Sequence, residues 1–218
     1  MLLVMDTSGP FCSAALFDLK ANKLVGEMSE NLGRGHAERL MPMLEELLAG
    51  AQRNWQDITR LGVVNGPGSF TGLRVGLATA RGLALALDVP CNTVTVFDAF
   101  NEEFGSEGGL GVVMDARRDQ IWTQCFEENG STEGPQVLAV SDTGAALPDT
   151  IKRFAGSAAT ILAGSLGRDV VVVGDALSPP IAAVARCIAN QPPADEKPIA
   201  LYLRAPDAKP QTPLVAKA

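Results

Sequence analysis

The chain repeats its opening strand–turn–strand pattern after half its length. The segment LVMDTSGPFCSAALFD at 3–18 lies over VVMDARRDQIWTQCFE at 112–127 without a gap. Both copies carry Val-Met-Asp at the end of an apolar run, and both close on Phe followed by an acidic residue. A repeat of this kind predicts two related α/β subdomains. Two unrelated strand–turn–strand units would also look alike over so few positions, so the residues alone leave that alternative open.

Apolar periodicity predicts the elements of both halves. The first half reads as strands 2–6, 11–18 and 22–29, a leucine-rich helix 36–49, a strand 61–65, a helix 70–87, a strand 91–96 and a helix to 104. The second half reads as a strand near 136–140, a helix 142–153, strands near 160–163 and 170–173, and a helix 179–190. We therefore expect an N-terminal subdomain 1–104, a smaller C-terminal subdomain 110–204, and an extended or disordered tail 205–218.

Charge and composition narrow the classes of partner. Eighteen basic and twenty-five acidic residues give a net charge of −7. Affinity for nucleic acid comes largely from neutralising phosphates, so a contact with RNA would have to be shared with a more basic partner. Asp6 interrupts the N-terminal apolar run too early for a signal peptide, and no apolar run is long enough to predict a membrane span. The four cysteines form no CxxC pair, and we expect a cytoplasmic protein.

The glycine-rich stretch NGPGSFTGLRVG at 65–76 has the composition of a phosphate loop but not its spacing. A Walker A loop needs a lysine, and none lies between Lys23 and Lys152. The third glycine of a dinucleotide fingerprint falls one residue late, at Gly72. A nucleophile elbow fails as well, because Ser69 follows Gly68 directly.

The helix after this turn carries two rows of small residues at four-residue spacing. The first row is Gly68, Gly72, Gly76, Ala80 and Ala84, and the second is Ala78, Gly82 and Ala86. Such a row lets another element approach the helix closely. One helix cannot present both rows to one neighbour, so we expect contacts on two sides.

Metal and acid–base chemistry have few candidates. His36 is the single histidine, which excludes motifs that need two imidazoles, and we expect it near a helix start with a local polar partner. Asp6 and Asp115 each end an apolar strand at a turn. With Thr7 they are the candidates for a magnesium and phosphate site across a cleft. Local sequence favours the simpler role, in which each carboxylate starts its turn by accepting backbone hydrogen bonds.

Five stretches together resemble the TsaB (YeaZ) family, a bacterial component of the tRNA threonylcarbamoyladenosine machinery. GPGSFTGLRVGLATARGLALALDVP at 66–90 is similar to the family signature. MDTSGPFCSAALFD at 5–18, HAERLMPMLEELL at 36–48, VMDARRDQIW at 113–122 and LYLRAPDA at 201–208 agree in order and spacing. The resemblance implies an α/β actin/Hsp70-like fold with two ribonuclease-H-like subdomains, the second one reduced.

The resemblance also implies a function. Proteins of this kind are non-catalytic pseudoenzyme subunits that pair with a metal-binding TsaD-like catalytic subunit and work with a TsaE-like ATPase. The complex transfers a threonylcarbamoyl group to the tRNA adenosine beside the anticodon. This implies no catalytic residue, metal or cofactor in this chain, ATP and magnesium only at the level of the complex, and tRNA contact only through it. One alternative is a stand-alone nucleotide-dependent enzyme that uses Asp6, Thr7 and Asp115. Another is a peptidase, which the single histidine argues against.

The family resemblance places the partner surface on the helices 36–49 and 70–87, packed as a four-helix bundle with their counterparts. Carried onto this chain, the contact candidates are Leu40, Leu44, Leu47, Gly72, Gly76 and Ala80, with Arg74 nearby. We expect the same surface to form a homodimer when the partner is absent. Gly76→Leu is then expected to weaken association by overpacking a helix crossing.

Overall fold

Two antiparallel hairpins, one in each half of the chain, begin the two sheets of the molecule. The computed structural model describes residues 1–105, 108–127, 130–131 and 134–203. β1 (Leu2–Asp6) pairs with β2 (Phe11–Asp18), and β6 (Leu110–Arg117) pairs with β7 (Gln120–Glu127). Asp6 and Asp115 stand at equivalent places, each near the end of the first strand of its hairpin. The sequence repeat is therefore a structural repeat.

Both sheets continue from their hairpin in the same way. The first has the order β3-β2-β1-β4-β5, with β3 (Lys23–Asn31) beside β2, and β4 (Arg60–Gly66) and β5 (Cys91–Thr95) parallel to β1. The second has the order β11-β10-β6-β7-β8, with β10 (Arg153–Ala155) and β11 (Val171–Gly174) parallel to β6. The short strands β8 (Gly130–Ser131) and β9 (Gln136–Ala139) pair with β7. The expected pair of α/β subdomains is confirmed.

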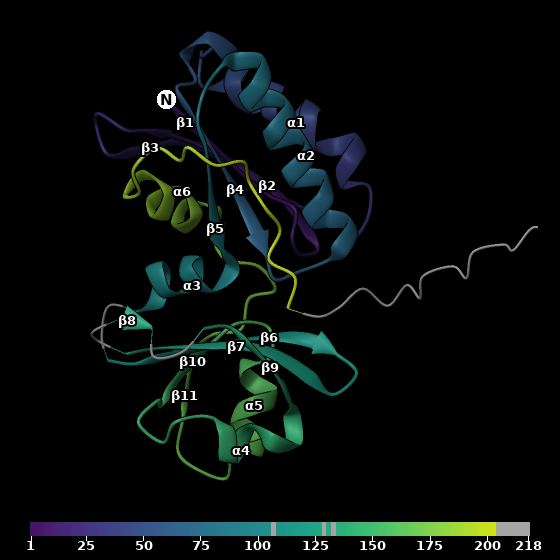
Figure 1. Cartoon of the computed structure of the whole chain (residues 1–218), viewed down its shortest axis with the longest axis vertical. Coiled ribbons are helices and arrows are strands. Elements are labelled where there is room, and N and C mark those ends of the chain that lie inside the picture. Colours follow the sequence, from purple (N-terminus) through teal and green to yellow (C-terminus); the bar gives the residue numbers. More distant parts are fainter. Residues whose placement is uncertain (106–107, 128–129, 132–133, 204–218) are drawn as a thin grey trace, which may run out of the picture.

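Helices cover both faces of the first sheet (Figure 1). α1 (His36–Gly50) and α2 (Phe70–Leu87) pack on one face, and α6 (Ile181–Ala189) lies on the other, beside α3 (Val96–Phe104). Alternate residues of β1 serve the two cores, because successive strand side chains point to opposite faces. Leu3 and Met5 join the core under α1 and α2, while Leu2 and Val4 join the core shared with α3 and α6.

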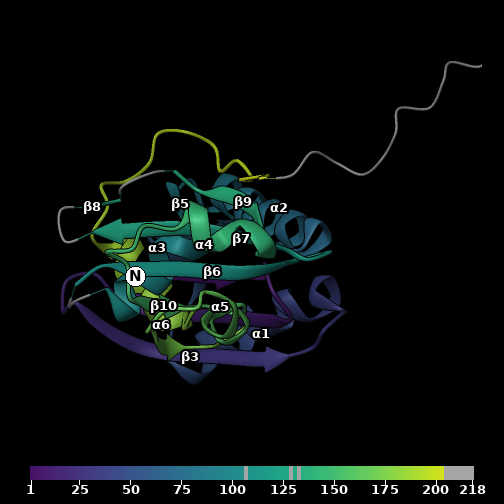
Figure 2. The ribbon, with the colours of Figure 1, turned by 90° about the horizontal axis from the view of Figure 1, so that it is seen from below.

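Two short helices cover the face of the second sheet that points away from α3 (Figures 1 and 2). They are α4 (Thr143–Ala146) and α5 (Ala159–Ser165). The predicted helix 142–153 is too long. The helix found, α4, has a single turn and follows a 3₁₀ turn (Val140–Asp142). It ends there because Leu147, which precedes Pro148, adopts an extended conformation. The predicted strand near 160–163 is also wrong, since those residues form α5, which buries Ala159 and Leu162 against the sheet.

The last helix returns to the first sheet. α6 contacts β1, β2, β4 and β5, and Ile188 lies over Gly62 so closely that a side chain at position 62 would collide with it. The predicted C-terminal subdomain 110–204 is therefore too long, because in space it ends near β11. The predicted tail 205–218 lies outside the described residues.

After α6, the segment 191–203 runs back along the first subdomain as a strap (Figure 1). The side chain of Asn92 donates to the carbonyl oxygen of Pro192 at 2.7 Å, and the guanidinium of Arg81 donates to that of Pro198. Further along, the amide of Leu201 donates to the carbonyl oxygen of Asn65 at 2.8 Å. These bonds bring 201–203 to the start of α2.

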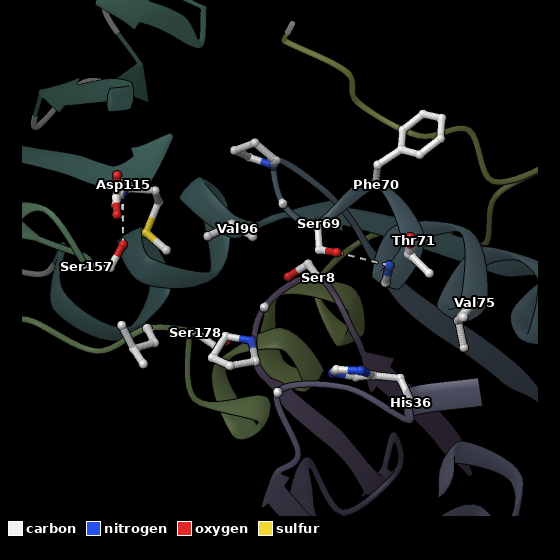
Figure 3. Close-up of a pocket in the computed structure, with 18 of the residues that line it drawn as sticks. Ser8, His36, Ser69, Phe70, Thr71, Val75, Val96, Asp115, Ser157 and Ser178 are labelled. Carbon is white, nitrogen blue, oxygen red and sulfur yellow. Dashed lines mark hydrogen bonds between the residues drawn. The ribbon is translucent and has the colours of Figure 1, made fainter. Parts of the chain in front are cut away.

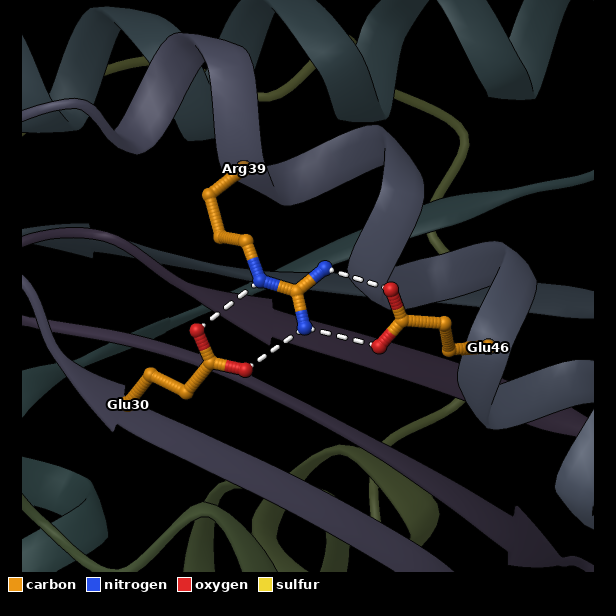
Figure 4. Close-up of polar contacts among 3 residues, drawn as sticks. All are labelled: Glu30, Arg39 and Glu46. Atoms are coloured by element: carbon orange, nitrogen blue, oxygen red, sulfur yellow. Dashed lines mark hydrogen bonds and ion pairs between the residues drawn. The ribbon is translucent and has the colours of Figure 1, made fainter.

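One arginine ties the edge strand β3 to α1 (Figure 4). The guanidinium of Arg39 donates to both carboxylate oxygens of Glu30 on β3 and to both of Glu46 on α1, at 2.6–2.9 Å. These bonds hold the pKa of each carboxyl below its usual range. Charged side chains on an edge strand also disfavour pairing with a second chain.

Candidate functional site

A pocket of about 1280 Å³ lies where the loops of the two subdomains meet (Figure 3). Its walls come from the turn after β1, the loop between β3 and α1, the start of α2, the end of β6 and the strap. The lining includes 8–10, 33–38, 67–72, 114–117, 177–179 and 201–203. Ligands of α/β proteins bind outside the carboxyl ends of parallel strands, and β1 and β4 both end here. The pocket is the candidate site.

Asp6 does not line the pocket. Its side chain is 2% exposed, and Oδ1 accepts a hydrogen bond of 2.7 Å from the amide of Ser8. Burial raises the pKa of the Asp6 carboxyl, and the hydrogen bonds with Ser8 only partly offset this. The structure thus gives Asp6 the turn-building role that local sequence favours.

Thr7 also has a structural role. Its hydroxyl is buried and donates to the carbonyl oxygen of Gly72 in the first turn of α2, at 2.7 Å. This bond fixes the turn after β1 to α2. The phosphate-binding candidates Asp6 and Thr7 both lie behind the pocket wall.

Asp115 faces the pocket from the other subdomain. It is exposed, Oδ1 accepts from the amide of Arg117 at 2.7 Å, and its own amide donates to Ser157 Oγ at 2.9 Å. The turn beyond it, 117–119, has three successive residues at φ between 55° and 61°, which is unusual without glycine. In the described part of the chain, no three His, Cys, Asp or Glu residues cluster closely enough to hold a metal ion. The two aspartates are not brought together in one open site.

Three buried polar atoms that line the pocket have no hydrogen-bond partner among the described residues. They are Nε2 of His36, Nε1 of Trp122 and Oγ of Ser178. Buried polar atoms are nearly always paired, so these point to an occupant of the pocket. The expected local partner of His36 is not found for Nε2. Trp122 and Ser178 were not singled out from the sequence, because neither lies in a spacing that predicts chemistry.

The comparisons with known proteins agree with this architecture. The model of the TsaD family, described as tRNA N6-adenosine threonylcarbamoyltransferase, matches residues 22–191, well over half of the chain. The tRNA threonylcarbamoyladenosine biosynthesis protein TsaB of Bacillus subtilis is 33% identical over 136 residues, which are 61% of this chain and 58% of that protein. The chain belongs to the TsaB/YeaZ branch of this family. The match spans less than two thirds of the B. subtilis protein.

Solved structures show the fold of this TsaB/YeaZ-family chain. YeaZ from Pseudomonas aeruginosa superposes with a TM-score of 0.74 at 25% identity, over 93% of this chain and 99% of that one. A Bacteroides thetaiotaomicron protein described as having an actin-like ATPase fold gives a TM-score of 0.50 at 8% identity, over 87% and 96%. The expected actin-like fold is confirmed.

Six of the seven residues predicted for a partner surface are buried within this TsaB/YeaZ-family protein. Leu40, Leu44 and Leu47 are at most 5% exposed and pack between α1 and the first sheet. Ala80 is fully buried beside them. The leucine spacing that predicts a helix therefore marks the face that packs on the sheet. A partner cannot reach these side chains in this structure.

The first small row of α2 faces the turn after β1. A side chain at Gly68 would meet the backbone of Ser8, one at Gly72 the carbonyl oxygen of Thr7, and one at Gly76 would lie 2.6 Å from Thr7 Oγ1. Gly72 and Gly76 are thus buried by an intramolecular contact, which corrects their assignment to a partner surface.

The second small row faces outward. Ala78, Gly82 and Ala86 are exposed, and nothing lies within 4 Å of a Cβ built at Gly82. Leu85 on the same helix is 86% exposed, and Met41 on the neighbouring α1 is 37% exposed. The expectation of contacts on two sides of α2 is half met, since one row is filled by the chain itself and the other is open.

Arg74, the seventh candidate, is exposed at the start of α2. Its guanidinium carbon lies 3.7 Å from the centre of the Phe70 ring, whose other ring neighbour is Tyr202 of the strap, at 5.3 Å between centroids. Such cation–π and aromatic contacts seat the strap against α2 at the mouth of the pocket.

By length and composition α2 is the one helix of the described residues that could cross a membrane. Its face carrying Leu73, Gly76 and Leu77 is buried on the sheet. Core helices of soluble proteins meet the same criterion, so the finding is weak evidence.

Proposed function

We propose that this chain is a non-catalytic subunit of a tRNA-modifying complex. It would pair with a TsaD-like catalytic subunit, work with a TsaE-like ATPase, and support threonylcarbamoyl transfer to the tRNA adenosine beside the anticodon. The family membership supports the pathway, and the names of the relatives supply the reaction.

The exposed outer face of α2 is the surface through which this chain would bind the catalytic subunit. It presents the second small row, with Leu85 standing 86% exposed and an unfilled surface at Gly82. Small residues let a partner helix approach closely, and exposed large apolar side chains on a small-residue face mark interaction sites. Because Leu40, Leu44 and Leu47 are buried, the proposed contact uses the outward residues of the same two helices. A homodimer through this face is the expected state without the partner.

The structural hydrogen bonds of Asp6 and Thr7 support a non-catalytic role for this chain. Asp6 accepts a hydrogen bond within the turn after β1, and Thr7 donates one to α2. With ATP and magnesium entering only in the complex, this chain would need no cofactor of its own. Its acidic net charge fits tRNA contact through the assembly. As a subunit of such a complex, the chain is expected to act in the cytoplasm.

Reconstitution tests the proposal. Threonylcarbamoylation of tRNA is measured with the TsaD-like and TsaE-like proteins, with and without this chain, and with this chain alone. We expect modification only when all three proteins are present, and co-purification of this chain with the TsaD-like subunit. An unchanged rate without this chain would refute the scaffold role.

The pocket supports one alternative, a stand-alone nucleotide-dependent enzyme that uses Asp115. Calorimetry of the isolated chain with ATP and magnesium separates the two. Tight binding accompanied by turnover would favour the enzyme, whereas heat below detection and no turnover would favour the scaffold.

A further inference from the structure

The N-terminus of α1 opens into the pocket without a cap. Gly35 precedes the helix in a left-handed conformation, φ 89°, and has no side chain that could accept a hydrogen bond. The amides of Glu38 and Arg39 donate to the carbonyl oxygen of Gly35, whereas the amides of His36 and Ala37 make no backbone hydrogen bond within the described residues. Unpaired amides at the start of a fifteen-residue helix carry partial positive charge.

His36 supplies an independent observation at the same place. Its side chain is 9% exposed and lines the pocket, and Nε2 is buried with no partner among the described residues. Figure 3 shows the imidazole extending from the start of α1 into the pocket. A buried polar atom that is left unpaired destabilises the protein, so a hydrogen-bonding group of a ligand would relieve this cost.

The charges around His36 define which ligand fits. Arg34, in the loop before α1, lines the pocket and adds a full positive charge. Two carboxyls oppose it: Glu38 in the first turn of α1, which lines the pocket, and the buried Asp6, which already accepts from Ser8. The uncapped amides, an imidazole N–H and a guanidinium are all donors, and donors of this kind bind oxyanions.

We propose that this end of the pocket binds the phosphate or carboxylate group of a small molecule, held by the two free amides of α1, His36 Nε2 and Arg34. The rest of the molecule lies toward Trp122 and Ser178, which also line the pocket and whose Nε1 and Oγ atoms are unpaired as well. This assignment does not depend on the proposed partner subunit.

The single histidine makes the test specific. The full chain is titrated with inorganic phosphate, acetate or adenosine monophosphate, each in a separate series. Nitrogen–proton spectra follow the one imidazole and the amides of His36 and Ala37. We expect saturable shifts of these three signals at millimolar anion. A response to phosphate and the nucleotide alone identifies a phosphoryl group, and a response to acetate as well identifies a carboxylate site.

Variants with opposite expected signs complete the test. His36→Ala should weaken binding of the responding anion at least tenfold, and Glu38→Gln should strengthen it about threefold by removing the opposing charge. Val25→Ala, at an exposed position on the edge strand β3, is the matched control and should bind as the wild type does. The wild-type spectra decide even if His36→Ala does not fold. No saturable shift with any of the three anions, or unchanged affinity in a folded His36→Ala, would overturn the proposal.

Discussion

The hydroxyl group of Thr7 donates a hydrogen bond of 2.7 Å to the carbonyl oxygen of Gly72, in the first turn of α2. The turn after β1 approaches the helix so closely that a side chain at position 72 would collide with the Thr7 carbonyl oxygen, and one at position 76 with the Thr7 hydroxyl. The glycines after β4 therefore hold the chain's own turn against α2. They shape the wall of the pocket and leave the opposite side of α2 for other contacts.

The first prediction compares two glycines of this helix. Gly76→Ala should destabilise the protein by about 1–3 kcal/mol, because the new methyl group overpacks against Thr7. Gly82→Ala should stabilise it by about 1 kcal/mol, since the surface there is open and alanine is the better helix former. Urea unfolding of both variants measures the difference. Equal effects at the two sites would contradict the packing argument.

The expected loss of association in Gly76→Leu is accordingly revised to a loss of folding stability.

The second prediction concerns the outer face of α2. Leu85→Glu should raise the Kd for the TsaD-like subunit, and for self-association, at least tenfold, because a charge replaces an exposed apolar contact. Folding stability should stay within about 0.5 kcal/mol of the wild type. Ile161→Glu is the matched control, since Ile161 is 60% exposed on α5 of the other subdomain. Light scattering and co-purification provide the readout. A similar loss in both variants would point to a different surface.

The third prediction is a pH dependence from Asp6. Burial raises the pKa of this carboxyl in the folded chain, so above its unfolded pKa of about 3.9 the native state holds the proton more tightly than the unfolded one. Its contribution to stability is complete below that pH and is lost as the pH rises through the folded pKa. Asp6→Asn keeps an acceptor for the Ser8 amide and should remove this loss. Urea midpoints measured from pH 4 to pH 8 for both proteins test it, and parallel curves would refute it.

The fourth prediction concerns thiol reactivity. Burial raises the pKa of Cys12 to about 11, and of Cys91 and Cys187 to about 12. At pH 8 these thiols should react with iodoacetamide at least about a hundredfold more slowly in the folded chain than in guanidinium, because so little thiolate is present. Mass spectrometry of each cysteine peptide over time provides the measurement. Rapid labelling of Cys12 in the native state would contradict the burial.

Local pattern was sufficient for most of the first subdomain. The apolar runs at 2–6 and 11–18 are buried on both faces, and the leucine spacing of α1 reports one buried face. Both patterns are readable from residue order. The second subdomain was harder to predict, because its elements are short. A residue like Leu162 packs equally well from a strand or a helix, and Pro148 ended a helix that the pattern extended.

The sequence by itself determined the repeat, the family, the glycine turn and the absence of a Walker loop, because all of these depend on residue type and spacing. The tertiary structure decided which face each residue serves. α2 is apolar or small almost all round, so its sequence does not say whether Gly76 or Gly82 meets the sheet. The turn carrying Thr7 settles that choice from about seventy residues away. The same long-range packing buries Asp6 and sets the unpaired His36 in the pocket.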